Sequence, residues 1–214
     1  MTSRPDPQPG LELMRGTALI GLPVVGIASG NALGDVKDVL YDAEAGAILG
    51  LTLNKRGGLF AGPMKHPLAA ADVFAIGRDA VMVPSDDPWS ATADEARRAT
   101  AGSRNVLGND VLTDAGERLG VVTDLIVVIG ELGRGSAGEV VGYQIRGEKA
   151  VQGREGGDLL VPLPDTLAVS GSHLVVPAST APYVRGDLSG FGLAVEEFRA
   201  QLGKPLGTAE EEES

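Results

Sequence analysis

The sequence contains no cysteine, which excludes disulfide bonds, thiolate metal sites and cysteine nucleophiles. Aromatic residues make up only 4% of the chain, whereas glycine occurs 31 times. Few aromatics and many glycines favour small, turn-rich domains with aliphatic cores. The lack of cysteine also fits a reducing compartment, and we expect a cytoplasmic protein.

Positive charge is scarce, because 18 lysines and arginines stand against 29 acidic residues and leave a net charge of −11. Phosphate backbones and anionic membranes repel such a chain unless it carries a local basic patch. No basic amphipathic helix is evident either. The composition therefore argues against a DNA partner and against membrane association.

Long hydrophobic runs are also missing. The longest, Leu119–Leu132, is interrupted by Asp124 and falls short of the roughly 20 apolar residues that span a membrane. The opening "MTSRPDPQPG" lacks the apolar centre of a secretory leader. We expect residues 1–12 to be a disordered leader and residues 206–214, with their run of glutamates, to be a solvated acidic tail.

What the chain does contain is an internal repeat. "LGDVKDVLYD" at Leu33–Asp42 is echoed 86 residues later by "LGVVTDLIVV" at Leu119–Val128. "GLTL" and "GYQI" follow 92 residues apart, and "ADVFAIGRDAVMVP" and "PDTLAVSGSHLVVP" follow 93 residues apart. The growing offset indicates an insertion in the second copy, which we place in a long flexible hairpin, "GELGRGSAG", at residues 130–138.

Each copy is predicted to consist of short strands. Residues 47–53 and 139–145 are rich in β-formers, and the strands at residues 80–84 and 173–177 stop at a proline. Strands at this spacing favour a small barrel or a sandwich.

Two helices are expected. Residues 90–102, with Thr92 as N-cap, would connect the copies. Residues 193–203 would place Leu193, Phe198 and Leu202 on one face and end at Gly203.

The repeated glycines and aspartates are predicted to be structural. Gly34 and Gly120 would occupy tight turns before a strand, where glycine adopts positive φ readily. Asp38 and Asp124 interrupt apolar runs, and a buried carboxylate without partners is costly. We therefore predict a bulge or bend at which each carboxylate accepts N–H groups from a neighbouring loop. A ligand role for the aspartates remains the alternative.

The stretch "GLPVVGIASGNALGDVKDVLYDAEAGAILGLTL", followed by "DVFAIGRDAVMVP", resembles the PRC-barrel, a small β-barrel of the photosynthetic reaction centre and of a ribosome-maturation factor. The resemblance covers residues 16–86 well and residues 104–178 less well. It implies an adaptor or assembly module with no catalytic residues to carry over.

The expected fold is therefore all-β, with two tandem PRC-like barrels, one linking helix and a short C-terminal helix. The expected divisions are a leader (1–12), barrel 1 (13–88), a linker helix (89–103), barrel 2 (104–187), a C-terminal helix (188–205) and the acidic tail (206–214).

No enzymatic constellation emerges from the sequence. His66 and His173 have no metal-ligand spacing, and neighbours on a strand point to opposite faces, so Ser172 and His173 should not form a nucleophile–base pair. The glycine-rich residues 130–138 lead into a strand, whereas phosphate-binding loops lead into a helix. We predict no catalytic residue, no metal, no cofactor and no enzyme activity.

A binding role is predicted for the loop after the third strand of each copy, residues 54–67 and 146–157, where cations gather in an otherwise acidic chain. The candidate binding residues are Lys55, Arg56, Phe60, Lys65, Lys149 and Arg154. Phe60, together with Met64, would add an apolar anchor.

The predicted function is a non-enzymatic protein-binding or scaffold module. Exposed apolar edges would also allow a homodimer. Two alternatives stay open, namely an RNA-associated factor of ribosome assembly and a small-molecule binder or enzyme that uses a groove between the barrels.

Overall fold

The computed structural model describes residues 11–42, 46–56, 62–89, 106–132, 138–147, 157–163, 168–169 and 172–203. The predicted linker helix at residues 90–102 and the acidic tail lie outside these residues, as do residues 1–10 of the expected leader.

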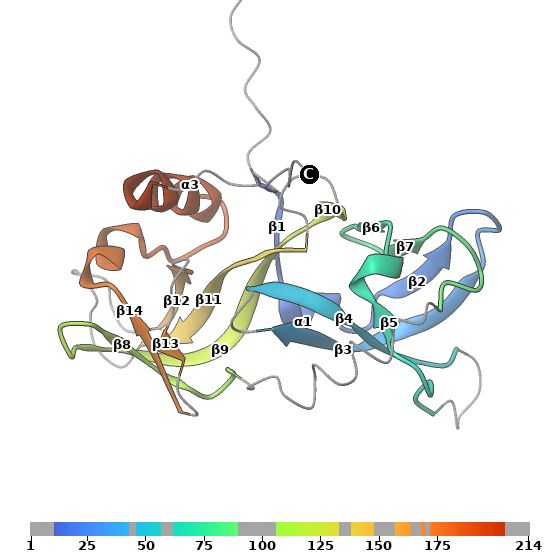
Figure 1. The fold of residues 1–214 in the computed structure, drawn as a ribbon, viewed down its shortest axis with the longest axis horizontal. Helices are drawn as coiled ribbons and strands as arrows, with labels where there is room; N and C mark the ends of the chain where they lie inside the picture. The colour runs from blue at the N-terminus through green and yellow to red at the C-terminus, as the bar shows by residue number, and fades with distance from the viewer. Residues whose placement is uncertain are drawn as a thin grey trace, which may run out of the picture.

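The chain is mostly β, and its first sheet is built almost entirely from the first half of the sequence. The strands are β2 (Pro23–Gly26), β3 (Ala32–Asp42), β4 (Ala47–Asn54), β5 (Leu68–Ala69), β6 (Ala75–Ile76) and β7 (Val81–Val83). They follow the order β10-β6-β7-β2-β3-β4-β5, with β2 and β7 parallel. The 3₁₀ helix η1 (Ala70–Asp72) lies in the short connection from β5 to β6, so the sheet curls and brings these two strands near each other (Figure 1).

The second sheet repeats this arrangement with strands from the second half. They are β8 (Asp110–Thr113), β9 (Arg118–Val128), β11 (Val140–Arg146), β12 (Asp158–Pro162), β13 (Ala168–Val169) and β14 (His173–Val176). Their order is β12-β11-β9-β8-β14-β13, and here β8 and β14 are the parallel pair.

Each sheet also contains a short strand from the other half of the chain. β1 (Leu13–Arg15) precedes the first sheet in sequence but pairs with β9 of the second. β10 (Gly130–Glu131) follows β9 but pairs with β6 of the first sheet. The sequence predicted a long flexible hairpin at residues 130–138, and this was wrong for its first two residues. They are ordered because the open edge of β6 supplies hydrogen-bonding partners that no local pattern reveals.

The predicted C-terminal helix is present as α3 (Phe191–Leu202), and Gly203 ends it with φ 81°. Its predicted apolar face was wrong, because Leu193 and Leu202 are 63% and 42% exposed. The buried positions are Phe191, Ala194, Val195, Phe198 and Arg199. A helical face recurs every three or four residues, and the five-residue step from Leu193 to Phe198 leaves it.

Helix α3 explains the unbroken apolar run in β9. The inner side of β9 faces the main core, whereas Ile126 and Val128 on its outer side pack with Phe191 and Val195 of α3. Because both faces of the strand are covered, residues 125–129 are all buried. Two short helices complete the described elements, α1 (Gly16–Leu19) and the 3₁₀ helix η2 (Ala178–Tyr183). None of the helices in the described ranges is long and apolar enough to cross a membrane.

The repeated glycines lie inside strands, not in the turns before them as predicted. Gly34 belongs to β3 and Gly120 to β9. A Cβ on Gly34 would lie 2.8 Å from the carbonyl oxygen of Asn54, and one on Gly120 would lie 2.4 Å from that of Arg146. Glycine is needed at both places because the neighbouring strand approaches too closely for a side chain.

We predict that Gly120→Ala lowers the free energy of unfolding by about 2 kcal/mol or more, because its methyl group meets backbone atoms that cannot move independently. Gly186→Ala is the matched control, since a Cβ added there would meet no surrounding atom within 4 Å, and we expect a change within about 0.5 kcal/mol. Urea denaturation of both variants measures the difference. Equal stabilities would contradict the close-approach explanation.

Candidate functional site

Asp124 occupies the junction between the two halves. Its carboxylate accepts hydrogen bonds from the backbone N–H of Thr17 at 3.1 Å, from the Thr17 hydroxyl, and from the N–H of Leu125 at 2.7 Å. Thr17 belongs to α1, so this buried carboxylate fixes a helix from the first half of the sequence on a strand from the second. The strand register against β11 shifts between Gln144 and Ile145, which places Asp124 beside a β-bulge.

Asp38, the repeat counterpart of Asp124, lies in a different environment. The register of β3 against β4 also shifts here, between Val36 and Asp38. The Asp38 side chain is exposed, however, and it accepts a hydrogen bond from the N–H of Val39 at 2.9 Å. The same backbone irregularity therefore occurs in both halves, but its carboxylate has two different roles. Asp124 joins the two halves, whereas Asp38 faces solvent.

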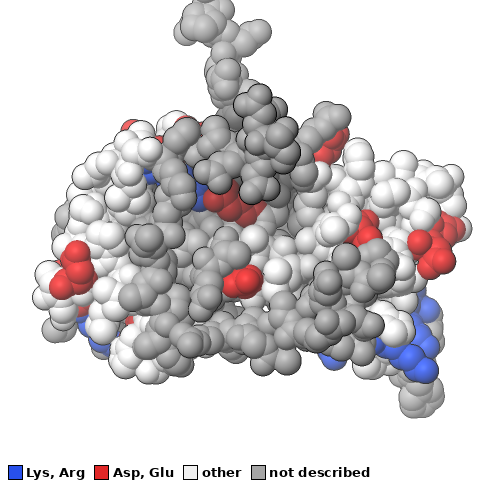
Figure 2. Space-filling model, viewed as in Figure 1, with Lys and Arg blue, Asp and Glu red and all other residues white. Residues whose placement is uncertain are grey.

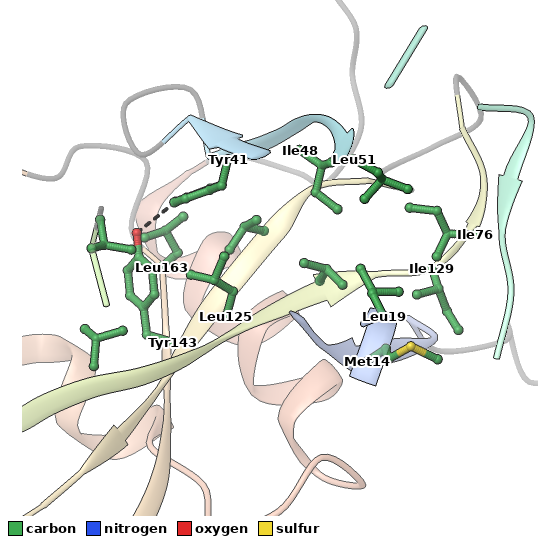
Figure 3. Close-up of a cluster of buried hydrophobic side chains, with 14 of the residues drawn as sticks. Met14, Leu19, Tyr41, Ile48, Leu51, Ile76, Leu125, Ile129, Tyr143 and Leu163 are labelled. Atoms are coloured by element: carbon green, nitrogen blue, oxygen red, sulfur yellow. Dashed lines mark hydrogen bonds between the residues drawn. The ribbon is translucent and has the colours of Figure 1, made fainter. Parts of the chain in front are cut away.

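The seam between the halves is filled with apolar side chains. Tyr41 and Leu51 from the first half and Leu125 and Tyr143 from the second belong to one continuous buried cluster (Figure 3). The Tyr41 and Tyr143 hydroxyls are hydrogen bonded to each other at 2.9 Å. The residues described at the seam thus form packed core and give no support to a ligand groove between the barrels.

Burial raises the pKa of both tyrosines, that of Tyr143 to about 12 and that of Tyr41 further still. Both hydroxyls are therefore neutral at ordinary pH. Because the folded pKa values exceed the ordinary value of 10, the pair's contribution to stability is complete below that pH and is lost as pH rises.

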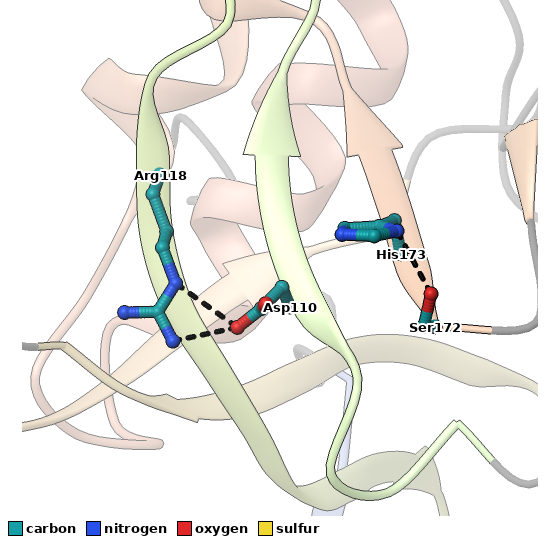
Figure 4. Close-up of polar contacts among 4 residues, drawn as sticks. All are labelled: Asp110, Arg118, Ser172 and His173. Carbon is teal, nitrogen blue, oxygen red and sulfur yellow. Dashed lines mark hydrogen bonds and ion pairs between the residues drawn. The ribbon is translucent and has the colours of Figure 1, made fainter.

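A polar group that resembles catalytic machinery lies on the outer side of the second sheet. The Ser172 hydroxyl and His173 Nδ1 are 2.9 Å apart (Figure 4). The expectation that these neighbours point apart was wrong, because Ser172 lies in a bend before β14 starts at His173. Asp110 lies beside His173 in the parallel register, and Arg118 donates two hydrogen bonds to one oxygen of that carboxylate.

This polar group lacks the surroundings that activate a nucleophile. Ser172 and His173 are both exposed, whereas the base that activates a serine is shielded from water. The Asp110–Arg118 pair is more than one third exposed and adds little stability. Nor do the described residues include a cluster of three or more His, Asp or Glu side chains able to hold a metal ion.

The predicted cations of the first loop gather at one end of the molecule. A bridge between Asn54 and Pro63 and a hydrogen bond from the Lys55 N–H to the Gly62 carbonyl bring the two arms of this loop together. Lys55 and Arg56 lie on one arm and Lys65 on the other, all exposed. Arg56 forms an ion pair with Asp35 of β3 at 3.0 Å.

The sequence missed Lys37, which is exposed on β3 two residues from Asp35, the ion-pair partner of Arg56, because it lies within an apolar strand and not in a loop. We call Lys37, Lys55, Arg56 and Lys65 the basic surface. In Figure 2 lysines and arginines gather at the end where Figure 1 shows the connection from β4 to β5.

The remaining predicted binding residues are not placed. Phe60, Lys149 and Arg154 lie outside the described residues. Met64, predicted as an apolar anchor for a partner, is instead half-buried against the main core, and its sulfur would lie 3.2 Å from a Cβ on Gly34. It packs inward because the loop folds back over Gly34.

The first sheet is thus a curled, barrel-like module whose exposed loop carries cations. Residues 11–88 match the model of the PRC-barrel domain. The match falls in the region where the sequence resembled that family, and it indicates a generic module without a specific function. No curated protein matches the chain.

We predict that Tyr41→Phe lowers the free energy of unfolding by about 1–3 kcal/mol, because the Tyr143 hydroxyl stays buried without its partner. The double variant Tyr41→Phe/Tyr143→Phe should lose less than the sum of the two single variants. Urea denaturation of all four proteins gives the coupling energy. Additive losses would mean that the hydroxyl pair contributes nothing of its own.

Proposed function

We propose that the protein is a non-enzymatic binding module of two tandem PRC-barrel units, which recognises an acidic segment of another protein through the basic surface of the first unit. The assignment of a second unit goes beyond the family match, which covers residues 11–88. It is supported by the strand registers.

The pairing of β3 with β4 recurs in β9 with β11. A shift of 86 residues for β3 and of 92 residues for β4 converts six pairs of facing residues into six pairs between β9 and β11. The first is Asp35 opposite Asn54, which becomes Val121 opposite Arg146. The last is Tyr41 opposite Ile48, which becomes Val127 opposite Val140. The parallel pairs correspond too, with Val24 opposite Val81 in one half and Val111 opposite Leu174 in the other. Matching bulges as well as matching strands favour duplication of one unit.

The observation that carries the binding proposal is that, in the described parts of both halves, exposed cations of the basic surface stand where the second half has uncharged residues. At the corresponding positions of the second half, Lys37 is replaced by Thr123 and Lys55 by Gly147. Since both halves form the same strand pairings, the fold does not require these cations. Exposed cations that the fold does not need, in a chain of net charge −11, favour recognition of a negatively charged partner.

A protein partner fits this surface better than RNA. Single-stranded RNA is held by aromatic side chains interleaved with cations, and the described part of the basic surface contains no aromatic residue. The acidic remainder of the chain would also repel a long phosphate backbone. A short acidic peptide segment can contact the cations without meeting that repulsion.

The test compares Lys37→Glu/Lys55→Glu/Lys65→Glu with the matched control Arg146→Glu, which reverses an exposed charge on the second half. Both proteins and the wild type are used as bait in a native extract at 50 mM and 300 mM salt, after treatment with ribonuclease. We expect an acidic protein that the wild type and the control retain at low salt and that the triple variant loses by at least tenfold. Equal capture by all three baits would contradict the proposal.

A gel-shift assay with single-stranded RNA distinguishes the main alternative. If the wild type shifts the RNA and the triple variant does not, the partner of the basic surface is RNA and not a protein. The expected result is no shift at 50 mM salt.

A further inference from the structure

Two backbone hydrogen bonds join the halves, and each bond is made by the residues that correspond, in the other half, to those of the first. The N–H of Ile48 donates to the carbonyl of Gly138 at 3.1 Å, and the N–H of Val140 donates to the carbonyl of Gly46 at 2.8 Å. These bonds flank an antiparallel bridge between Ala47 and Glu139.

The partners in this contact are repeat counterparts of each other. Gly46 and Gly138, Ala47 and Glu139, and Ile48 and Val140 are each 92 residues apart, the shift that relates β4 to β11. Exchanging the halves turns each hydrogen bond into the other. A pseudo-twofold axis therefore passes between Ala47 and Glu139, as it does at the centre of a symmetric dimer interface.

We propose that the seam is a protein–protein interface in its own right, in which the two halves bind each other as the subunits of a dimer do. The chain that connects them, residues 90–105, is then not needed to hold them together. This inference concerns the contact between the halves and does not depend on the basic surface or its partner.

Reciprocal exchange of strands supports this interface. Leu13 to Arg15 of the first half pair with Ile126 to Val128, and Gly130 and Glu131 of the second half pair with Ile76 and Ala75. Separating the halves would strip both contacts and expose backbone donors and acceptors on two sheets. Each half thus completes a sheet of the other.

Polar side chains fix the geometry of the same interface. Thr17 of the first half donates to the buried Asp124 carboxylate, and Arg15 donates to the side-chain oxygen of Gln144. The Tyr41 and Tyr143 hydroxyls form a further buried hydrogen bond between the two halves. Buried polar pairs of this kind select one arrangement of two apolar surfaces, because any other arrangement leaves them unpaired.

The core at the seam supplies the apolar part of the interface. Met14 and Leu19 from the first half and Ile129 from the second lie in the same buried cluster, near Ile76 (Figure 3). Because this cluster draws side chains from both halves, neither half encloses its own core completely. An interface built from continuous core is typical of obligate partners.

The test uses the full chain with a protease recognition sequence inserted between Trp89 and Val106. After complete cleavage, we expect the two fragments to elute together at the volume of the uncut protein and to melt in one transition. Their melting temperature should now rise with protein concentration, because folding has become coupled to association. The melting temperature of the uncut chain should not depend on concentration.

Two variants of the cleaved protein locate the interface. Thr17→Val should raise the dissociation constant of the fragments about tenfold or more, since it removes a hydrogen bond to a buried carboxylate. Ser172→Ala, in the bend just before β14, should leave the dissociation constant unchanged. Fragments that separate at micromolar concentration, that unfold on cleavage or that melt independently would overturn the inference.

A measurement on the unmodified chain covers the case in which the insertion itself prevents folding. Amide hydrogens of β3 and β4 and those of β9 and β11 should exchange with the same free energy of opening, because the halves unfold together. A difference of more than about tenfold in protection between the halves would overturn the inference. Neither result bears on capture of an acidic partner by the basic surface.

Discussion

A curled sheet must satisfy the backbone donors and acceptors along its open edges, and this requirement shapes the whole molecule. β5 and β6 end close together in the first sheet, but the free side of β6 still has to be paired. Strand β10 from the other half pairs with it, and β1 in return pairs with β9. Because each half meets the other's requirement, the halves form one structure with a continuous core and not two separate domains on a tether.

The two halves have the same strand arrangement but differ in the elements that pack against it. α3 packs on the outer side of the second sheet, and its Arg199 forms an ion pair with Glu139 on the pseudo-twofold axis. The Arg199 side chain is only 7% exposed, so the helix is fixed close to the seam. The described part of the chain places no equivalent helix on the first sheet, whose loop carries the cations. The second half thus contributes more of the buried framework, and we propose that the first contributes the recognition surface.

Asp38 and Asp124 lie at equivalent places in the two sheets but have different roles. Both lie beside the same bulge, yet Asp124 is buried against Thr17 and Asp38 is exposed. A bulge interrupts the regular alternation of side chains between the two faces of a sheet. The neighbouring residues then decide where the side chain at the bulge points. Once Thr17 lies next to Asp124, that carboxylate gains two donors which a single unit on its own would not supply.

Local composition and spacing along the chain were enough to predict the strands around Ala47–Asn54 and Val140–Arg146, the C-terminal helix and the resemblance at residues 16–86. They also located the cations at Lys55, Arg56 and Lys65, but not Lys37. The strand exchange, the Tyr41–Tyr143 contact and the reason for Gly34 and Gly120 emerged only from the folded arrangement. Tyr41 and Tyr143 are 102 residues apart, and a contact over that distance depends on how completed sheets approach each other, which no local pattern of residues encodes.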